Sequence, residues 1–233
     1  MAIFAISDLH LSFGTDKPMD VFGENWENHT VKLKENWLRV IGEEDWVLVP
    51  GDISWAISLE ESIPDFTWLN SLPGKKILSK GNHDYWWSTY KKFEDFKAVH
   101  GFHTLNMLYN NAFSWGGYAI CGTRGWKSPD EPDFSEEDEK IYKREQERLK
   151  LSLKEGVKLG GTLIAQLHYP PFDARHRPNA FGDILVEYGV KLCVYGHIHG
   201  KVPRQALYEE VEGIAFRLVA CNQIAFDPVK LIG

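Results

Sequence analysis

The sequence Gly81-Asn82-His83-Asp84 follows a short apolar segment, Lys76–Leu78, and combines turn residues with side chains that bind metals. Four further clusters of such side chains follow apolar segments in the same way. Short apolar segments bounded by turns are typical of buried strands, and side chains just past the carboxyl ends of neighbouring strands meet in one crevice. The sequence therefore predicts one site built from seven ligand-type residues: Asp8, His10, Asp52, Asn82, His168, His197 and His199.

The apolar segments alternate with segments of helical spacing, which is typical of an α/β domain. The predicted strands are Ala2–Ile6, Trp46–Val49, Lys76–Leu78, Leu163–Leu167 and Leu192–Tyr195. The predicted helices are Val31–Ile41, Leu59–Ser71, Thr89–Val99, Glu136–Lys158 and Ala180–Tyr188. The longest of these helices has clear end signals, because Ser135 and Asp138 form a capping-box pattern and Gly160-Gly161 provides a stop.

Two other stretches indicate hairpins. Phe102–Cys121 is interrupted at Asn110-Asn111 and Gly116-Gly117, and Val202–Ala220 is interrupted at Glu212-Gly213. Hairpins beside parallel strands predict an α/β fold with two mixed β-sheets flanked by helices, a four-layer α-β-β-α sandwich. Two longer irregular segments, Ser12–Thr30 and Gly122–Asp133, are expected to shape the mouth of the site, because loops of this length are usually functional.

The composition restricts the partners and the compartment. The 233 residues carry a formal net charge of −7, which disfavours nucleic acid as a partner because nucleic-acid affinity comes mainly from Lys and Arg. The length fits a single domain over residues 1–233. Three cysteines cannot all pair, the start of the chain lacks the basic region of a signal peptide, and no segment approaches the roughly 18 apolar residues of a membrane span. We therefore expect a soluble cytoplasmic protein.

The combination of Asp8-Leu9-His10, Gly51-Asp52, Gly81-Asn82-His83-Asp84 and Gly196-His197-Ile198-His199 resembles the signature of the calcineurin-like metallophosphoesterases. The resemblance extends from Asp8 to His199, essentially the whole chain. It implies two divalent metal ions, the first held by Asp8, His10, Asp52 and His199 and the second by Asp52, Asn82, His168 and His197, with Asp52 bridging. Oxygen and imidazole ligands suit Mn, Fe, Zn, Co or Ni, and the sequence does not choose among them.

The same resemblance implies a mechanism. Two cations about 3.5–4 Å apart stabilise the attacking and leaving oxygens and lower the pKa of a bound water to about 7, so the nucleophile is a metal-held hydroxide. His83 would be the general acid that protonates the departing alkoxide or braces the phosphoryl group. The alternative for His83 is a turn histidine that only forms a hydrogen bond with Asp84.

Two positions depart from the family pattern. Several branches of the family have Asp or His three residues after the bridging aspartate, where it orients the catalytic histidine, but this chain has Trp55, whose indole is only an N–H donor. Asp84 or another carboxylate then orients His83, or His83 acts without an orienting partner. Family members also often have two consecutive histidines where this chain has His168-Tyr169, so only His168 is carried over.

Two residues are candidate substrate contacts. Arg124 follows the apolar segment Tyr118–Cys121 and could clamp a phosphate, or it could form an ion pair with the acidic stretch Asp130–Asp133. Trp87 adjoins Trp86, and two adjacent rings cannot easily share one face. One ring could therefore stack on a base or an apolar group of the substrate, or both could be core residues.

The sequence thus predicts a dinuclear metal-dependent phosphoric ester hydrolase that acts on a small phosphomonoester or phosphodiester. The alternative is a non-catalytic binding scaffold on the same fold. The complete set of seven ligands favours the enzyme.

Overall fold

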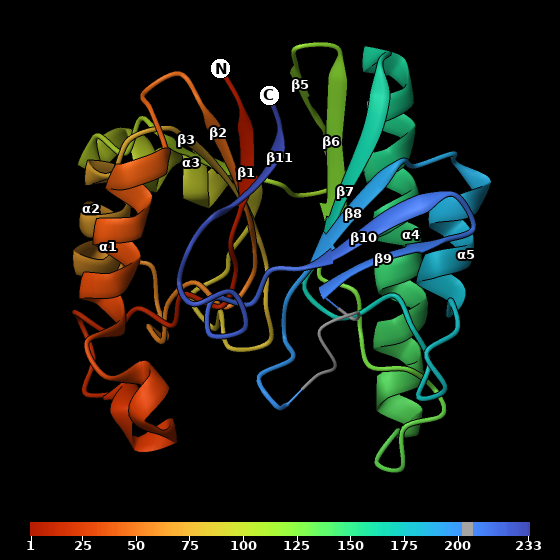
Figure 1. Cartoon of the computed structure of the whole chain (residues 1–233), viewed down its shortest axis with the longest axis horizontal. Helices are drawn as coiled ribbons and strands as arrows, with labels where there is room; N and C mark the ends of the chain where they lie inside the picture. Colours follow the sequence, from red (N-terminus) through yellow and green to blue (C-terminus); the bar gives the residue numbers. More distant parts are fainter. Residues whose placement is uncertain (202–206) are drawn as a thin grey trace. The chain divides into compact units, whose positions relative to one another are not determined.

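Each predicted strand forms at the expected place in the computed structural model, which describes residues 1–201 and 207–233. The chain divides into two units, one made of Met1–Met107 with Val219–Gly233 and the other of Leu108–Leu218. Each unit contains one β-sheet, and its helices lie on one face of that sheet (Figure 1). Both sheets are mixed, so the predicted α/β architecture of two mixed sheets flanked by helices is confirmed.

The first unit contains a five-stranded sheet in the order β11-β1-β2-β3-β4. Strands β1 to β4 run parallel, and β11 pairs antiparallel with β1. Three helices connect the successive parallel strands and therefore cover the same face of the sheet (Figure 1). The elements are β1 (Ile3–Ala5), the 3-10 helices η1 (Met19–Phe22) and η2 (Glu24–Trp26), α1 (His29–Val40), β2 (Trp46–Pro50), α2 (Ile63–Ser71), β3 (Lys75–Ser79), α3 (Tyr90–His100), β4 (Leu105–Met107) and β11 (Val229–Ile232).

The second unit contains a six-stranded sheet in the order β5-β6-β7-β8-β10-β9. The four central strands run parallel, and the two edge strands are antiparallel to their neighbours. Helices α4 and α5 pack on the same face of this sheet (Figure 1). The elements are β5 (Phe113–Trp115), β6 (Tyr118–Thr123), α4 (Glu136–Leu159), β7 (Thr162–Leu167), α5 (Ala180–Glu187), β8 (Leu192–Tyr195), β9 (Tyr208–Val211) and β10 (Ile214–Leu218).

Two local expectations are corrected by the structure, and one strand was missed. A hairpin at Asn110-Asn111 was expected, but β4 pairs parallel with β3 in the first sheet and β5 pairs with β6 in the second, because a turn signal does not specify the partner of a strand. Helix α2 begins at Ile63 rather than at Leu59, because Pro64 fits only the first turn of a helix. Strand β11 was not predicted.

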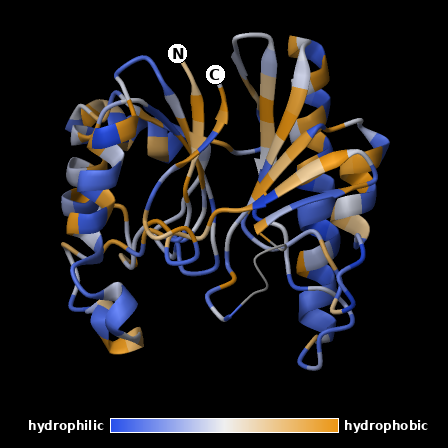
Figure 2. Cartoon of the chain, viewed as in Figure 1, coloured by the Kyte–Doolittle hydropathy of each residue, from blue (hydrophilic) through white to orange (hydrophobic). Residues whose placement is uncertain are grey.

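The remaining turn and cap predictions are confirmed. β5 and β6 form a hairpin across Gly116-Gly117, and β9 and β10 form one across Glu212-Gly213; residues 202–206 of that predicted stretch lie outside the described residues. The capping box of α4 is present, with the Ser135 hydroxyl accepting from the main-chain N–H of Asp138. Figure 2 shows that apolar residues concentrate in the strands, whereas the helices carry many polar residues.

All three cysteines are free and buried. Among the helices of the described residues, none is both long enough and apolar enough to cross a membrane.

Lys76 is a fully buried lysine on β3, the strand that leads to the Gly81-Asp84 turn. Its ammonium group donates hydrogen bonds to the carbonyl of Leu72 and to the hydroxyl of Thr104, and it lies 5.7 Å from the centroid of the Trp37 ring. Burial lowers the pKa of Lys76 from 10.5 to about 7, and the charge of Glu43 only partly opposes this change.

We expect the free energy of unfolding to rise with pH above neutrality because of Lys76. Between about pH 7 and 10.5 the unfolded chain keeps a proton on Lys76 that the folded chain has released, so raising the pH favours the folded state. The rise is at most about 1.4 kcal/mol per pH unit and should be absent from Lys76→Met. Urea unfolding of both proteins at several pH values measures it, and parallel pH profiles would contradict the lowered pKa.

Candidate functional site

Three predicted ligands of the first unit gather at the ends of β1 and β2. Asp8, His10 and Asp52 are buried, and each offers a ligand atom that lies within 4.8 Å of the others. The imidazole Nε2 of His10 lies 3.8 Å from Oδ2 of Asp52. Carboxylate oxygens together with an imidazole nitrogen are a donor set that suits divalent transition metals, so these residues fit a metal ion.

Main-chain hydrogen bonds hold the two ligand-bearing segments side by side. The N–H of Asp8 donates to the carbonyl of Gly51 at 3.0 Å, that of His10 to Asp52 at 3.0 Å, and that of Leu11 to Ile53 at 2.9 Å. These bonds continue the parallel pairing of β1 and β2 beyond the strands. The spacing of the ligands therefore follows from the register of the sheet.

The ligands themselves occupy an uncommon backbone conformation. Asp8, His10 and Asp52 have φ values of 58°, 45° and 52°. Left-handed φ values are sparse for residues other than glycine, are most frequent for Asn, Asp and His, and cost of order 1–3 kcal/mol each. The hydrogen bonds between the two ligand-bearing segments offset this strain.

Asp84 anchors the turn that carries Asn82 and His83. Its carboxylate is completely buried and accepts hydrogen bonds from five donors. These donors are the main-chain N–H groups of Gly81 (2.7 Å), Asp52 (2.9 Å), Ile53 (2.9 Å) and Ser54 (3.3 Å) and the indole N–H of Trp86 (2.9 Å). Asp84 thus ties the turn after β3 to the turn after β2.

The charge state of Asp84 reflects two opposing influences. Burial, followed by the nearby charge of Asp52, raises the pKa of Asp84 to about 6, and the main-chain N–H groups lower it. Because its oxygens accept from the main chain and from Trp86, Asp84 organises the turns rather than orienting His83. Sequence reasoning missed this role, although an acid that ends a Gly-Asn-His sequence is a signal for it.

Asn82 and His83 are half-buried in the turn after β3. The main-chain N–H of His83 donates to Oδ1 of Asp52 at 2.8 Å. Gly81 makes this approach feasible, because an added Cβ would lie 2.1 Å from the same oxygen. The turn after β3 therefore contacts Asp52, which belongs to the group of first-unit ligands that also contains Asp8 and His10.

Aromatic rings surround the histidines of the first unit. The ring centroid of Trp55 lies 4.4 Å from that of His83 and 5.1 Å from that of His10, and it is stacked on His10. Trp26 contacts His10 edge-on at 5.7 Å. Trp55 therefore contacts two histidines of the candidate site.

In the second unit, His168 and His197 follow β7 and β8 and point toward each other. Nδ1 of His197 lies 3.3 Å from Nε2 of His168. His168 is fully buried, His197 has a φ of 70°, and His199 is exposed two residues later. Two converging imidazole nitrogens are again a donor set that fits a divalent cation.

The two predicted substrate contacts, Arg124 and Trp87, both pack against other residues of the protein. The Arg124 guanidinium stacks 4.2 Å from the Trp126 ring, and its Nη2 lies 3.5 Å from Oε1 of Glu145, a buried carboxylate on α4. The ion pair therefore involves Glu145 rather than Asp130–Asp133. Burial lowers the pKa of Arg124, although Glu145 opposes this. Trp86 is buried and packs 5.1 Å from the half-buried ring of Trp87.

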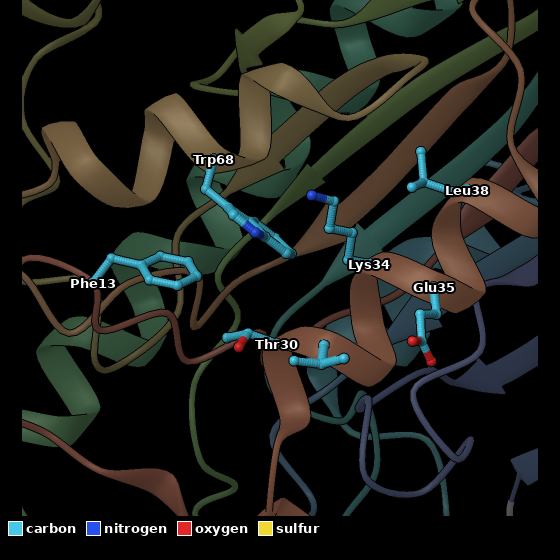
Figure 3. A pocket seen from close by; sticks show the side chains of 7 residues that line it. Phe13, Thr30, Lys34, Glu35, Leu38 and Trp68 are labelled. Atoms are coloured by element: carbon cyan, nitrogen blue, oxygen red, sulfur yellow. The ribbon is translucent and has the colours of Figure 1, made fainter.

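A surface pocket of the first unit contains none of the predicted site residues. It lies between α1 and α2, where the Lys34 side chain points toward Trp68 and Phe13 lies beside Trp68 (Figure 3). Apolar side chains line much of it, and its lining residues offer no cluster of metal ligands. The candidate site is thus defined by the clusters at the strand ends.

Comparisons with known proteins agree with this architecture. The family model described as calcineurin-like phosphoesterase matches residues 1–201. The Gene 66 protein of Mycobacterium phage L5 is 36% identical over 80 residues, which is 34% of this chain and 37% of that protein. The match therefore spans little more than a third of this curated relative.

Solved structures share the fold at low sequence identity. Phosphopantetheinyl hydrolase from Mycobacterium tuberculosis has a TM-score of 0.58 at 14% identity, with 99% of this chain and 95% of that chain covered. A protein of Thermus thermophilus has a TM-score of 0.59 at 14% identity, with 99% and 97% covered. A protein of unknown function from Aquifex aeolicus has a TM-score of 0.51 at 15% identity, with 98% and 95% covered.

We expect Asp84→Asn to lower the free energy of unfolding by about 2–4 kcal/mol, because the amide removes a charge and directs an NH₂ group toward buried donors. The matched control is Asp227→Asn in the same unit, where an exposed carboxylate pairs with Arg39 and the loss should be under about 1 kcal/mol. Urea unfolding of the three proteins measures the difference. Equal stability of the two variants would show that Asp84 does not anchor the turns.

Proposed function

The chain belongs to the calcineurin-like phosphoesterase family, and on that premise we propose that it is a metal-dependent enzyme that hydrolyses a phosphomonoester or a phosphodiester. The observation that carries this proposal is the buried group of Asp8, His10 and Asp52, whose ligand atoms converge. Such a group of carboxylates and imidazole is costly to bury without a cation to balance its charge.

The proposed site takes two divalent ions, of which the first uses Asp8, His10, Asp52 and His199 and the second uses Asp52, Asn82, His168 and His197. This assignment requires both units to act as one metallophosphoesterase domain over residues 1–233. The convergence of His168 and His197 supports the second set. When bound, such ions stabilise charge on the phosphoryl oxygens and make water more acidic.

His83 is the proposed general acid. Its main-chain N–H is bonded to Asp52, so its side chain is held beside the proposed bridging ligand. The imidazole would donate a proton from a ring nitrogen to the oxygen of the leaving alcohol as the phosphorus–oxygen bond breaks. Trp55 and His10 limit the positions of the His83 ring through their contacts with it.

The proposed substrate is a small phosphorylated molecule. Arg124 remains a candidate contact because its Nε is buried without a hydrogen-bond partner among the described residues, and an anionic group would satisfy it. Trp87 is the candidate stacking surface. The likeness to phosphopantetheinyl hydrolase concerns the fold and does not select a substrate. The three free buried cysteines support a reducing compartment, which we propose to be the cytoplasm.

Metal-dependent hydrolysis tests the proposal directly. The purified protein should hydrolyse p-nitrophenyl phosphate or bis-p-nitrophenyl phosphate with added Mn²⁺ and lose this activity with a chelator. Asp52→Asn should lower activity by more than about 100-fold and reduce the bound metal, because this carboxylate is a proposed ligand of both ions. Asp227→Asn is the control and should behave as the wild type. If the wild-type protein binds no metal at millimolar Mn²⁺, the enzyme proposal fails and the scaffold alternative gains support.

Replacement of His83 tests the proposed acid separately. His83→Ala should lower the rate about 10²- to 10⁴-fold for an ester with an aliphatic alcohol as leaving group, and much less for a p-nitrophenyl ester, whose leaving group needs no proton. Metal content, measured by elemental analysis, should stay at the wild-type value. An equal loss for both esters would refute the acid role.

A further inference from the structure

We propose that Trp55 is a positioning residue that fixes the imidazole of His83 by ring packing. This inference rests on the proposed function and deepens it. It arises from three rings of the first unit that contact one another: Trp55 lies against His83 at 4.4 Å and against His10 at 5.1 Å, and His10 lies 5.7 Å from His83.

Packing is the means of orientation that an indole offers. The Trp55 ring has a single polar hydrogen and no acceptor, so it cannot accept a hydrogen bond from an imidazole N–H. Its N–H donates instead to Sδ of Met19 at 3.2 Å. The broad ring face is therefore left to contact the two histidines, stacked on His10 at 23° and tilted against His83 at 48°.

Trp55 is itself held firmly, which a positioning residue requires. Its main-chain N–H donates to the carbonyl of Leu11 at 2.9 Å, within the segment that carries Asp8 and His10. Met19, which accepts the indole N–H, is buried. The backbone and the indole of Trp55 are thus each held by a hydrogen bond, so the ring presents a fixed surface to His83.

The same contacts connect the long segment after β1 to the site. Met19 begins the 3-10 helix η1, and the ammonium group of Lys17 lies 5.9 Å from the centroid of the Trp55 ring, within the range of a cation–π contact. Trp26 of η2 contacts the edge of His10. Lys17 and Met19 therefore contact Trp55, and Trp26 contacts His10, so these three residues are linked to His83 through the rings that pack on it.

If residue 55 acts through a hydrogen bond, the variants Trp55→Ala and Trp55→Phe should behave alike. If it acts through ring packing, they should differ. If a hydrogen bond from residue 55 mattered, a phenylalanine would fail as alanine does, because neither can form it. If packing matters, Trp55→Phe should retain most of the function, because a second aromatic ring can still contact His83. The comparison of the two variants therefore separates the two explanations.

The experiment compares the wild type with Trp55→Ala, Trp55→Phe and Trp68→Ala. Trp68 is the matched control, because it is another half-buried tryptophan of the first unit and packs on Phe13 rather than on a histidine. Each protein is assayed at saturating Mn²⁺ with a pair of esters that differ only in the leaving group, p-nitrophenolate or an aliphatic alkoxide. Metal content and urea stability are measured on the same preparations.

We expect Trp55→Ala to lower kcat for the alkyl ester about 10- to 100-fold, because a displaced acid loses alignment with the leaving oxygen. For the p-nitrophenyl ester the loss in kcat should be under about threefold, and KM should change little for either ester. Trp55→Phe should restore the alkyl-ester rate to within about threefold of the wild type. Trp68→Ala should leave the ratio of the two rates unchanged.

A second measurement does not depend on activity. In ¹H–¹³C spectra of the metal-free protein, the ring protons of His83 and His10 should shift in Trp55→Ala, because the ring current of the indole is lost, and those of His103 should not shift. Unchanged His83 resonances would overturn the proposal even if activity falls.

The outcomes distinguish this inference from the proposed function. A wild-type protein without metal-dependent hydrolysis defeats the proposed function, and the positioning role with it. An active wild type with equal losses for both esters in Trp55→Ala, or a similar change of the rate ratio in Trp68→Ala, overturns the role of Trp55 alone.

Discussion

The buried carboxylate of Asp84 is the constraint on which the first unit's part of the candidate site depends. It accepts four main-chain N–H groups from two separate turns and the indole N–H of Trp86. If these N–H groups were left buried and unpaired, each would cost about 1–3 kcal/mol. One side chain thus fixes the turn that carries Asp52 against the turn that carries His83.

The backbone around this anchor is strained where the ligands lie. Asp8, His10 and Asp52 all have left-handed φ values, and Gly81 has no room for a Cβ beside the Asp52 carboxylate. Strain of this kind persists only where the surroundings fix the conformation, and here the extended pairing of β1 and β2 does so. The parallel sheet therefore stabilises an arrangement that the isolated turns would not adopt.

Aromatic packing gives the first unit a second means of fixing its histidines. A polar orienting residue acts through one directed hydrogen bond, whereas Trp55 acts through the area of its ring and is itself fixed by Met19 and Leu11. This arrangement ties the segment after β1 to the centre of the site.

The sequence by itself determined the strand–helix order, the cap of α4 and the positions after strands where ligand-type residues occur, because these depend on local periodicity and turn chemistry. The tertiary structure alone decided the pairing of β4 with β3, the pairing of β11 with β1, and the roles of Asp84 and Trp55. Strand partners and buried polar contacts join residues that are distant in the sequence, so no local pattern records them. A carboxylate or an indole acquires its role only when folding brings its partners within bonding distance.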